Sequence, residues 1–153
     1  MAAKKRKAFK HFAIINTMIN TMPKAYDSCD VVDYVLALLP GEKINLSSSR
    51  EHRSFHKLKG QYPDFFSDFR FNYNGHIYYS KKLENHIQKR KDDNTLELTW
   101  LNGVYRLGRE TKNIILEELS CKFSEEEKSK LKEMSESLKD SLAKKKLFLT
   151  RRE

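Results

Sequence analysis

The spacing of apolar residues predicts two helices in the first 40 residues. Over residues 9–22, apolar side chains recur at steps of three and four residues, which is typical of an amphipathic helix, and Pro23 ends it. The next helix begins at Asp27 or Ser28, either of which can cap it, and ends before the Pro-Gly pair that follows. Its predicted buried stripe comprises Val31, Val35, Leu38 and Leu39.

A third helix is predicted over residues 50–59, after a short extended piece at 43–46. Three consecutive serines before it offer N-caps, and Phe55 and Leu58 face inward. Gly60 then suits the C-cap position, where a left-handed backbone ends many helices.

Residues 67–82, SDFRFNYNGHIYYSKK, predict a β-hairpin, because apolar and polar residues alternate around a central Asn-Gly. A three-residue connection, with Gly75 in the left-handed position of a bulge, places Phe71 opposite Ile77 and Phe69 opposite Tyr79. A two-residue turn would move Ile77 to the polar face, so we prefer the bulge. The predicted polar face comprises Arg70, Asn72, His76 and Tyr78.

The rest of the chain predicts helices only. A short basic helix over 81–91 runs into a polar break, and a long helix follows over 95–123, with Leu98, Leu101, Ile115 and Leu119 on one side. The last helix starts with a capping box, Ser124 to Glu127. We therefore expect a mainly α (α+β) fold, in which a helical domain with one β-hairpin precedes a C-terminal helical hairpin or extension.

The net charge of +9 is unevenly distributed. Residues 1–91 hold 17 Lys/Arg against 8 Asp/Glu, whereas residues 92–153 hold 13 of each. This asymmetry favours a division into a basic flexible arm at 1–8, a polyanion-binding domain at 9–91 and a charge-balanced helical extension at 92–153. The apolar side of the extension either packs on the first part or docks on another subunit. The alternative is that the charge is only a solubility surface.

Composition narrows the location of the protein. Two distant cysteines, Cys29 and Cys121, match no metal or redox spacing and suit a reducing compartment, and no run approaches the length of a membrane span. The cluster KKRK at 4–7 is typical of a nuclear localisation signal or a phosphate-binding arm. We expect a nuclear protein without a membrane partner. The cytoplasm is an alternative, and the acid-poor first 26 residues also admit a mitochondrial presequence.

The order helix, helix, short strand, helix and hairpin resembles the winged helix-turn-helix superfamily over residues 9–82. The segment SSSREHRSFHKLKGQYPDFFSDFRFNYNGHIYYSKK, residues 47–82, is similar to the recognition helix and wing of these domains. The resemblance implies a winged-helix-like domain in which the third helix and the hairpin contact DNA. From Leu83 onward the chain carries no such resemblance.

The residue chemistry points to the same ligand. The third helix exposes basic side chains opposite its apolar stripe, its N-terminus offers free amides, and the hairpin has a polar face. The expected nucleic-acid contacts are Lys4, Lys5, Arg6 and Lys7 of the arm, with Lys10 just after it; Ser48, Ser49, Arg50, Arg53, His56, Lys57 and Lys59 of the third helix; and Arg70, Asn72, His76, Tyr78, Lys81 and Lys82 of the hairpin and its exit.

Catalytic chemistry has little support. His52 and His56 are four residues apart on one helix, but no third metal ligand is evident, and the chain has no phosphate loop or nucleophile elbow. We expect a non-enzyme without cofactor, metal or small-molecule substrate. Its expected role is that of a DNA-binding accessory subunit of a larger nuclear complex, such as a transcription, chromatin or DNA-modifying assembly, with the C-terminal helices docking on a larger protein. The alternatives are RNA binding and a structural subunit that uses its winged-helix surface to bind protein.

Overall fold

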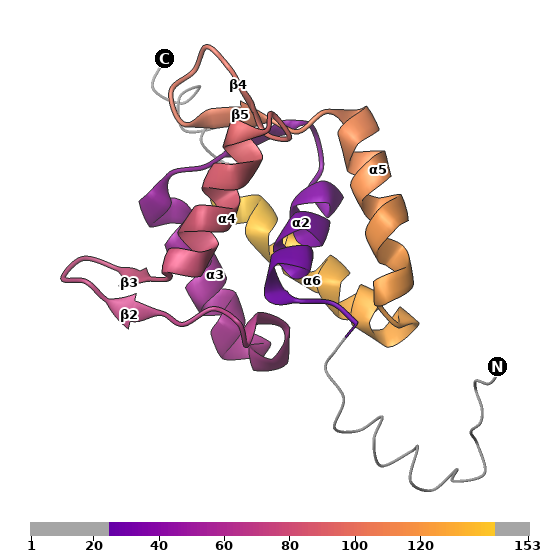
Figure 1. Ribbon diagram of the computed structural model, residues 1–153, viewed down its shortest axis with the longest axis horizontal. Coiled ribbons are helices and arrows are strands. Elements are labelled where there is room, and N and C mark those ends of the chain that lie inside the picture. Colours follow the sequence, from indigo (N-terminus) through magenta and orange to yellow (C-terminus); the bar gives the residue numbers. More distant parts are fainter. Residues whose placement is uncertain (1–24, 143–153) are drawn as a thin grey trace, which may run out of the picture.

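The computed structural model describes residues 25–142, which form five α-helices and two small antiparallel sheets (Figure 1). The mainly α (α+β) class is confirmed. The predicted arm and the helix expected over 9–22 lie outside the described residues. The elements are α2 (Ser28–Leu38), β1 (Lys43–Asn45), α3 (Ser48–Gln61), β2 (Asn72–Tyr73), β3 (Tyr78–Tyr79), α4 (Lys81–Asp92), β4 (Glu97–Leu98), β5 (Val104–Arg106), α5 (Arg109–Leu119) and α6 (Glu125–Leu142).

Side-chain caps fix where the helices begin. The carboxylate of Asp27 accepts from the amide of Asp30, and the Asp30 carboxylate accepts in return from the amide of Asp27. Ser47 caps α3 by accepting from the amide of Arg50. The capping box predicted at the start of the last helix is also present, since Ser124 and Glu127 exchange hydrogen bonds of 2.8 and 3.1 Å.

The long helix predicted over 95–123 is wrong in its first half. There the chain forms β4 and β5, and only α5 is helical. Gly103 has φ +81° and turns the chain between the two strands. Strand β5 lies between β4 and β1, so that Tyr105 pairs with Leu98 on one side and with Ile44 on the other. Strand β5 is stabilised by β1, which lies about sixty residues earlier in the chain. Helical spacing alone could not reveal this pairing.

The β2–β3 hairpin forms, but its register differs from the predicted one, so that Asn72 of the predicted polar face stands opposite Tyr79 of the predicted apolar face. Asn72 pairs with Tyr79 and Tyr73 with Tyr78, instead of the predicted pairing of Phe71 with Ile77 and Phe69 with Tyr79. The Asn74 side chain accepts hydrogen bonds from the amides of His76 and Ile77, and these two bonds close the turn between the strands. Phe69 and Ile77 are buried, whereas the residues of the predicted polar face are exposed.

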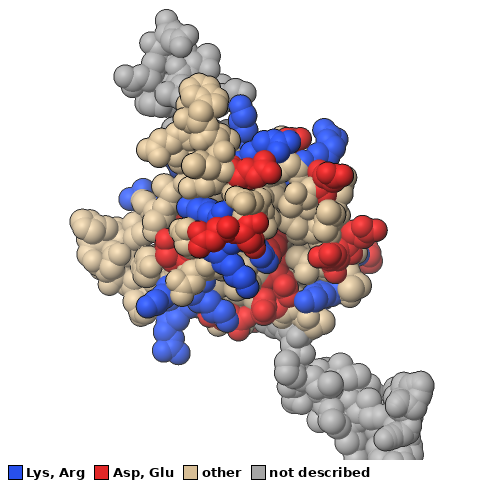
Figure 2. All heavy atoms as spheres, turned by 45° about the horizontal axis from the view of Figure 1, so that its top comes forward, with Lys and Arg blue, Asp and Glu red and all other residues tan. Residues whose placement is uncertain are grey.

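Charges of both signs mix on the surface of the described fold. Residues 25–142 hold 19 Lys/Arg and 20 Asp/Glu, and in Figure 2 blue and red side chains lie interleaved. The excess of +9 therefore comes from the sequence outside this range, because residues 1–24 and 143–153 together contain 11 Lys/Arg and one Glu. The basic character expected of the whole first part is concentrated in its first 24 residues.

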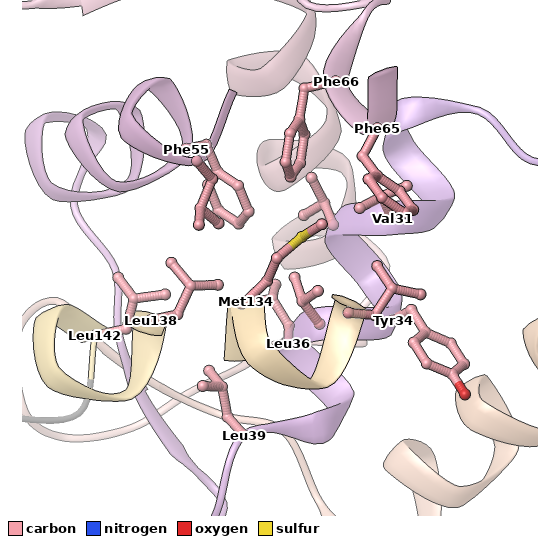
Figure 3. Packing of buried hydrophobic residues seen from close by; sticks show 14 of the residues in the cluster. Val31, Tyr34, Leu36, Leu39, Phe55, Phe65, Phe66, Met134, Leu138 and Leu142 are labelled. Atoms are coloured by element: carbon pink, nitrogen blue, oxygen red, sulfur yellow. The ribbon is translucent and has the colours of Figure 1, made fainter. Parts of the chain in front are cut away.

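A single hydrophobic core unites both parts of the chain. Figure 3 shows Met134 and Leu138 of α6 packed among Leu36 of α2, Phe55 of α3 and the neighbouring Phe66. Helix α5 packs along α2, and α6 crosses both α2 and α3. The residues from 92 onward therefore complete the core of the first part, and the chain does not divide into two cores near residue 91. Of the two roles left open for this segment, packing on the first part is the one that the structure shows.

Buried polar groups join α2 to α4. Asp33 accepts from Nε2 of His86 at 2.8 Å and from Nη2 of Arg90 at 2.8 Å. Burial alone would raise the pKa of Asp33, but these two hydrogen bonds hold it below its usual value. The carboxylate therefore stays ionised and links the two helices through two cationic partners.

Candidate nucleic-acid interface

The exposed strip of α3 consists of Ser49, Arg53 and Lys57, which follow one another at four-residue steps. We call these residues the α3 strip. On one side of it, a groove of about 390 Å³ separates α3 from α6 and is lined by Arg53, Lys57, Ser137 and Asp140, among others. The strip thus presents two free cationic side chains, with one carboxylate at the margin of the groove.

Two other basic residues predicted as contacts are used inside the fold. Arg50 is half-buried, and its guanidinium donates to the carbonyl of Ser141 at the end of α6 at 2.7 Å. Lys59 donates to the carbonyl of Phe69 at 2.6 Å and lies over the ring of Phe71. Both side chains donate hydrogen bonds to backbone carbonyls of neighbouring segments. They are therefore less available to a nucleic acid than the sequence predicts.

On the other side of α3, three rings form what we call the hairpin stack: His56, Tyr78 and Tyr73. The imidazole of His56 lies parallel to the ring of Tyr78, with centroids 4.2 Å apart, and Tyr73 is tilted against Tyr78 at 5.3 Å. Tyr78 is 47% and Tyr73 62% exposed. Large aromatic side chains this accessible at adjacent positions are uncommon on a surface without a binding role.

Two members of the hairpin stack, His56 and Tyr78, are among the contacts predicted from the sequence, whereas Tyr73 is not. The predicted register leaves Tyr73 in the connection between the strands, whereas in the structure it pairs with Tyr78. A bulky aromatic residue immediately before Asn-Gly is the signal that could have placed Tyr73 at the exposed end of the hairpin. In Figure 2 the hairpin, at the left as in Figure 1, is a projection without Lys, Arg, Asp or Glu.

The other predicted contacts surround the hairpin without joining the stack. Arg70, Asn72 and His76 are exposed, as are Lys81 and Lys82 in the first turn of α4. Two cations at a helix N-terminus are unfavourable next to the positive end of the helix dipole, and a bound anion would relieve this repulsion. Ser48 is exposed as well, but its hydroxyl donates to Glu84. The predicted contacts Lys4, Lys5, Arg6, Lys7 and Lys10 lie outside the described residues.

A second exposed feature is apolar and was not predicted. Trp100 is 89% and Leu98 74% exposed, both at the β4–β5 hairpin. The tip of this hairpin, between Glu97 and Arg106, forms a second uncharged projection near the top of Figure 2. Both residues fall in the helix predicted over 95–123, so the pattern gave no sign of their exposure.

The two histidines considered as a metal pair have different surroundings. His52 is fully buried and lies parallel to the ring of Tyr79, with centroids 4.6 Å apart, whereas His56 belongs to the hairpin stack. Next to His52, burial raises the pKa of Glu51 to about 8, although nearby Lys91 opposes the shift. Within residues 25–142, every helix is too short or too polar to cross a bilayer.

Comparison with known proteins assigns the chain to no family. No protein-family model matches it, and no similar curated protein or solved structure was found. The functional interpretation therefore depends on the geometry of the α3 strip, the hairpin stack and the basic terminal sequences.

Proposed function

We propose that this protein is a non-catalytic nucleic-acid-binding subunit, with double-stranded DNA as its ligand, that acts in a nuclear assembly. The observation that carries the proposal is the exposed hairpin stack beside the two free cations of the α3 strip. In the winged-helix interpretation, α3 is the recognition helix and the β2–β3 hairpin is the wing.

The division of roles follows from charge and shape. Phosphate contacts supply most of the affinity of a DNA-binding protein, and the described fold is nearly neutral. The 11 Lys/Arg of residues 1–24 and 143–153 therefore supply the electrostatic attraction. Arg53 and Lys57 then fix the position of α3 on the duplex, because cationic side chains on one helix face can reach both phosphates and guanine edges. The rings of Tyr73 and Tyr78 pack against the sugar-phosphate backbone or an accessible base.

Charge reversal of the α3 strip tests the proposal. The double variant Arg53→Glu, Lys57→Glu should bind a labelled duplex at least about tenfold more weakly than wild type, measured by fluorescence anisotropy of the full chain. The matched control is Lys130→Glu, Lys132→Glu, which reverses two exposed lysines on α6 and keeps the same net charge. Equal losses in both double variants would show that only net charge matters and would remove α3 from the interface.

The same assay identifies the type of nucleic acid. A duplex should bind more tightly than a single strand of equal length, and its affinity should fall steeply with salt. Tighter binding of single-stranded DNA or RNA would contradict the duplex assignment and would make the hairpin stack a base-stacking platform. Absence of binding at low salt would overturn the proposal as a whole.

The exposed β4–β5 hairpin favours a second candidate function, which is docking to a protein. Trp100 is almost fully exposed, and tryptophan is enriched at the centre of protein interfaces. This would place the partner-binding role on the β4–β5 hairpin, while the C-terminal helices stay in the core. The variant Trp100→Ser should keep the stability and DNA affinity of wild type but lose association with nuclear complexes in size-exclusion profiles. Unchanged profiles would contradict docking through this residue.

A further inference from the structure

Three potential metal ligands converge between α3 and α4. One ligand atom each from Glu51, His52 and Glu84 lies within 4.8 Å of the other two. Glu51 and His52 are 1% and 0% exposed, whereas the side chain of Glu84 is 30% exposed. The group is therefore enclosed on the side of α3 and open to solvent at Glu84, where an ion could enter.

Glu51 lacks a partner for one of its oxygens. Its Oε2 is buried and forms no hydrogen bond. A buried polar atom without a partner costs free energy, and the cost is larger for a carboxylate than for a neutral group. A metal ion bound at Oε2 would supply the missing partner.

The ring of His52 is oriented as in a metal site. Its Nε2 lies 3.0 Å from the carbonyl of Ser80, and a backbone carbonyl is a common partner for the N–H of a metal-bound histidine. With the proton on Nε2, the lone pair of Nδ1 faces the Ser48 carbonyl at 2.8 Å and the Glu84 carboxylate at 3.9 Å. In this tautomer these groups are all acceptors, and a metal ion at Nδ1 would take the place of the proton that Nδ1 otherwise donates to the Ser48 carbonyl.

We propose that Glu51, His52 and Glu84 bind one divalent transition-metal ion, with Zn²⁺ the preferred ion. Carboxylate oxygens alone would suit Mg²⁺ or Ca²⁺, and the imidazole nitrogen shifts the preference to Zn²⁺. The Ser48 carbonyl, next to Nδ1, or a water molecule completes the coordination.

The ion would act as a clip between two helices. Glu51 and His52 belong to α3, and Glu84 belongs to α4, which follows the β2–β3 hairpin directly. The ring of Tyr79 in β3 also covers His52. The ion would therefore stabilise α3, the hairpin and α4 as one unit. None of the three ligands belongs to the α3 strip or the hairpin stack, so the site is distinct from the proposed nucleic-acid contacts.

Zn²⁺ titration of the full chain tests the site. The protein is first stripped with EDTA and desalted, then titrated with Zn²⁺ and separately with Mg²⁺ in a calorimeter. The stripped chain should bind one equivalent of Zn²⁺, and its melting temperature should rise by about 5–10 °C when free Zn²⁺ exceeds Kd a hundredfold. Mg²⁺ should bind far more weakly. Failure of Zn²⁺ to bind at 1:1 or to raise the melting temperature would overturn the proposal.

Single substitutions assign the ligands. Glu84→Gln, at the exposed side, should weaken Zn²⁺ binding at least tenfold with little change in the metal-free melting temperature. Glu51→Gln should abolish the 1:1 binding, and the stripped variant should melt no lower than stripped wild type, because a neutral amide replaces the carboxyl group that lacks a partner. His76→Gln, on the exposed hairpin, is the control and should bind as wild type does. Wild-type Zn²⁺ affinity in both glutamate variants would place the ion elsewhere and overturn the assignment.

Discussion

Asp33 shows how single buried residues determine the arrangement of this fold. Asp33 is 8% exposed, and its carboxylate has both of its cationic hydrogen-bond partners only when His86 and Arg90 of α4 lie beside it. A shifted α4 would leave a buried charge without partners, which is costly. The pair of helices is therefore held in one register by a polar contact as well as by apolar packing.

This contact predicts a pH dependence of stability. Burial would lower the pKa of His86, but its hydrogen bonds to Asp33 and Cys29 raise it to about 9, above the value of about 6.5 in an unfolded chain. The stabilisation is therefore complete below pH 6.5 and is lost as the pH rises through 9. Urea unfolding of wild type should show this loss, on the order of 1–3 kcal/mol, relative to His86→Gln.

His76→Gln provides the control for this experiment, because His76 is exposed on the hairpin. Its stability should change with pH as that of wild type does. Parallel pH curves for wild type and His86→Gln would mean that His86 gains nothing from Asp33 in the folded state.

Two glycines predict opposite effects of the same substitution. Gly75 has φ +101°, where an L-residue is strained by roughly 1–2 kcal/mol, although a Cβ there would contact nothing within 4 Å. Gly60 lies within α3 and also has open space around it. Gly75→Ala should lower the melting temperature, and Gly60→Ala should raise it, by about 0.5–1 kcal/mol in free energy of unfolding. Shifts of equal sign, measured by thermal circular dichroism, would contradict these backbone assignments.

At the scale of elements, α5 is attached to the end of α2 by one buried lysine. The Nζ of Lys112, which is 9% exposed, donates to the carbonyls of Leu39 and Gly41 just beyond α2. Leu39 is the C-cap of α2, so its carbonyl is among those that a helix end leaves without an internal partner, and Gly41 lies two residues further on. Burial lowers the pKa of Lys112, so the two hydrogen bonds are obtained against a desolvation cost.

Removing the lysine should therefore destabilise the fold. Lys112→Met keeps the length of the side chain but leaves both carbonyls without this donor, and we expect a loss of about 1–3 kcal/mol in urea unfolding. Lys132→Met changes an exposed lysine on α6 and should stay within about 0.5 kcal/mol of wild type. A similar small effect of both substitutions would show that water replaces Lys112 at the end of α2.

The elements also show what sequence patterns reveal and what they miss. Caps and breakers act locally, so the starts of α2 and α6 and the end of α2 could be predicted to within a residue or two. Strand β5 could not, because its partner β1 is remote and Leu98, Leu101 and Val104 also fit helical spacing. One local signal was available: Asn102-Gly103 repeats the Asn-Gly pair that located the first hairpin.

For the candidate interface, it was easier to predict which residues are basic or aromatic than which of their side chains remain free to contact a ligand. Exposed Arg53, Lys57 and Tyr78 follow from the helical and strand periodicities. The engagement of Arg50 with Ser141 could not be foreseen, because it requires knowing that α6 ends beside the start of α3. Long-range packing therefore decides which cations remain free, and the sequence does not encode this in any short pattern.

At the scale of the whole molecule, the hydrophobic core requires the last helix. The core residues beyond position 92 are Leu96, Leu107, Phe123, Leu131, Met134, Leu138 and Leu142. Loss of one such side chain typically costs about 2–5 kcal/mol, and a domain has only about 5–15 kcal/mol in all. A chain ending at Asp92 should therefore be unfolded by circular dichroism, whereas one ending at Leu142 should keep a cooperative thermal transition. A folded 92-residue chain would mean that the first part has a sufficient core of its own.

The position of α2 also affects how the protein is made. Its apolar side is covered by α5 and α6, which are translated after it, and Leu39 and Met134 are 95 positions apart in the chain. At roughly 5–20 residues per second, a ribosome needs about 5–20 s to cover this interval. During that time a nascent chain displays Val31, Val35 and Leu39 without their final partners. This apolar surface is therefore exposed to aggregation for longer than that of a helix that packs on its immediate neighbour in the chain.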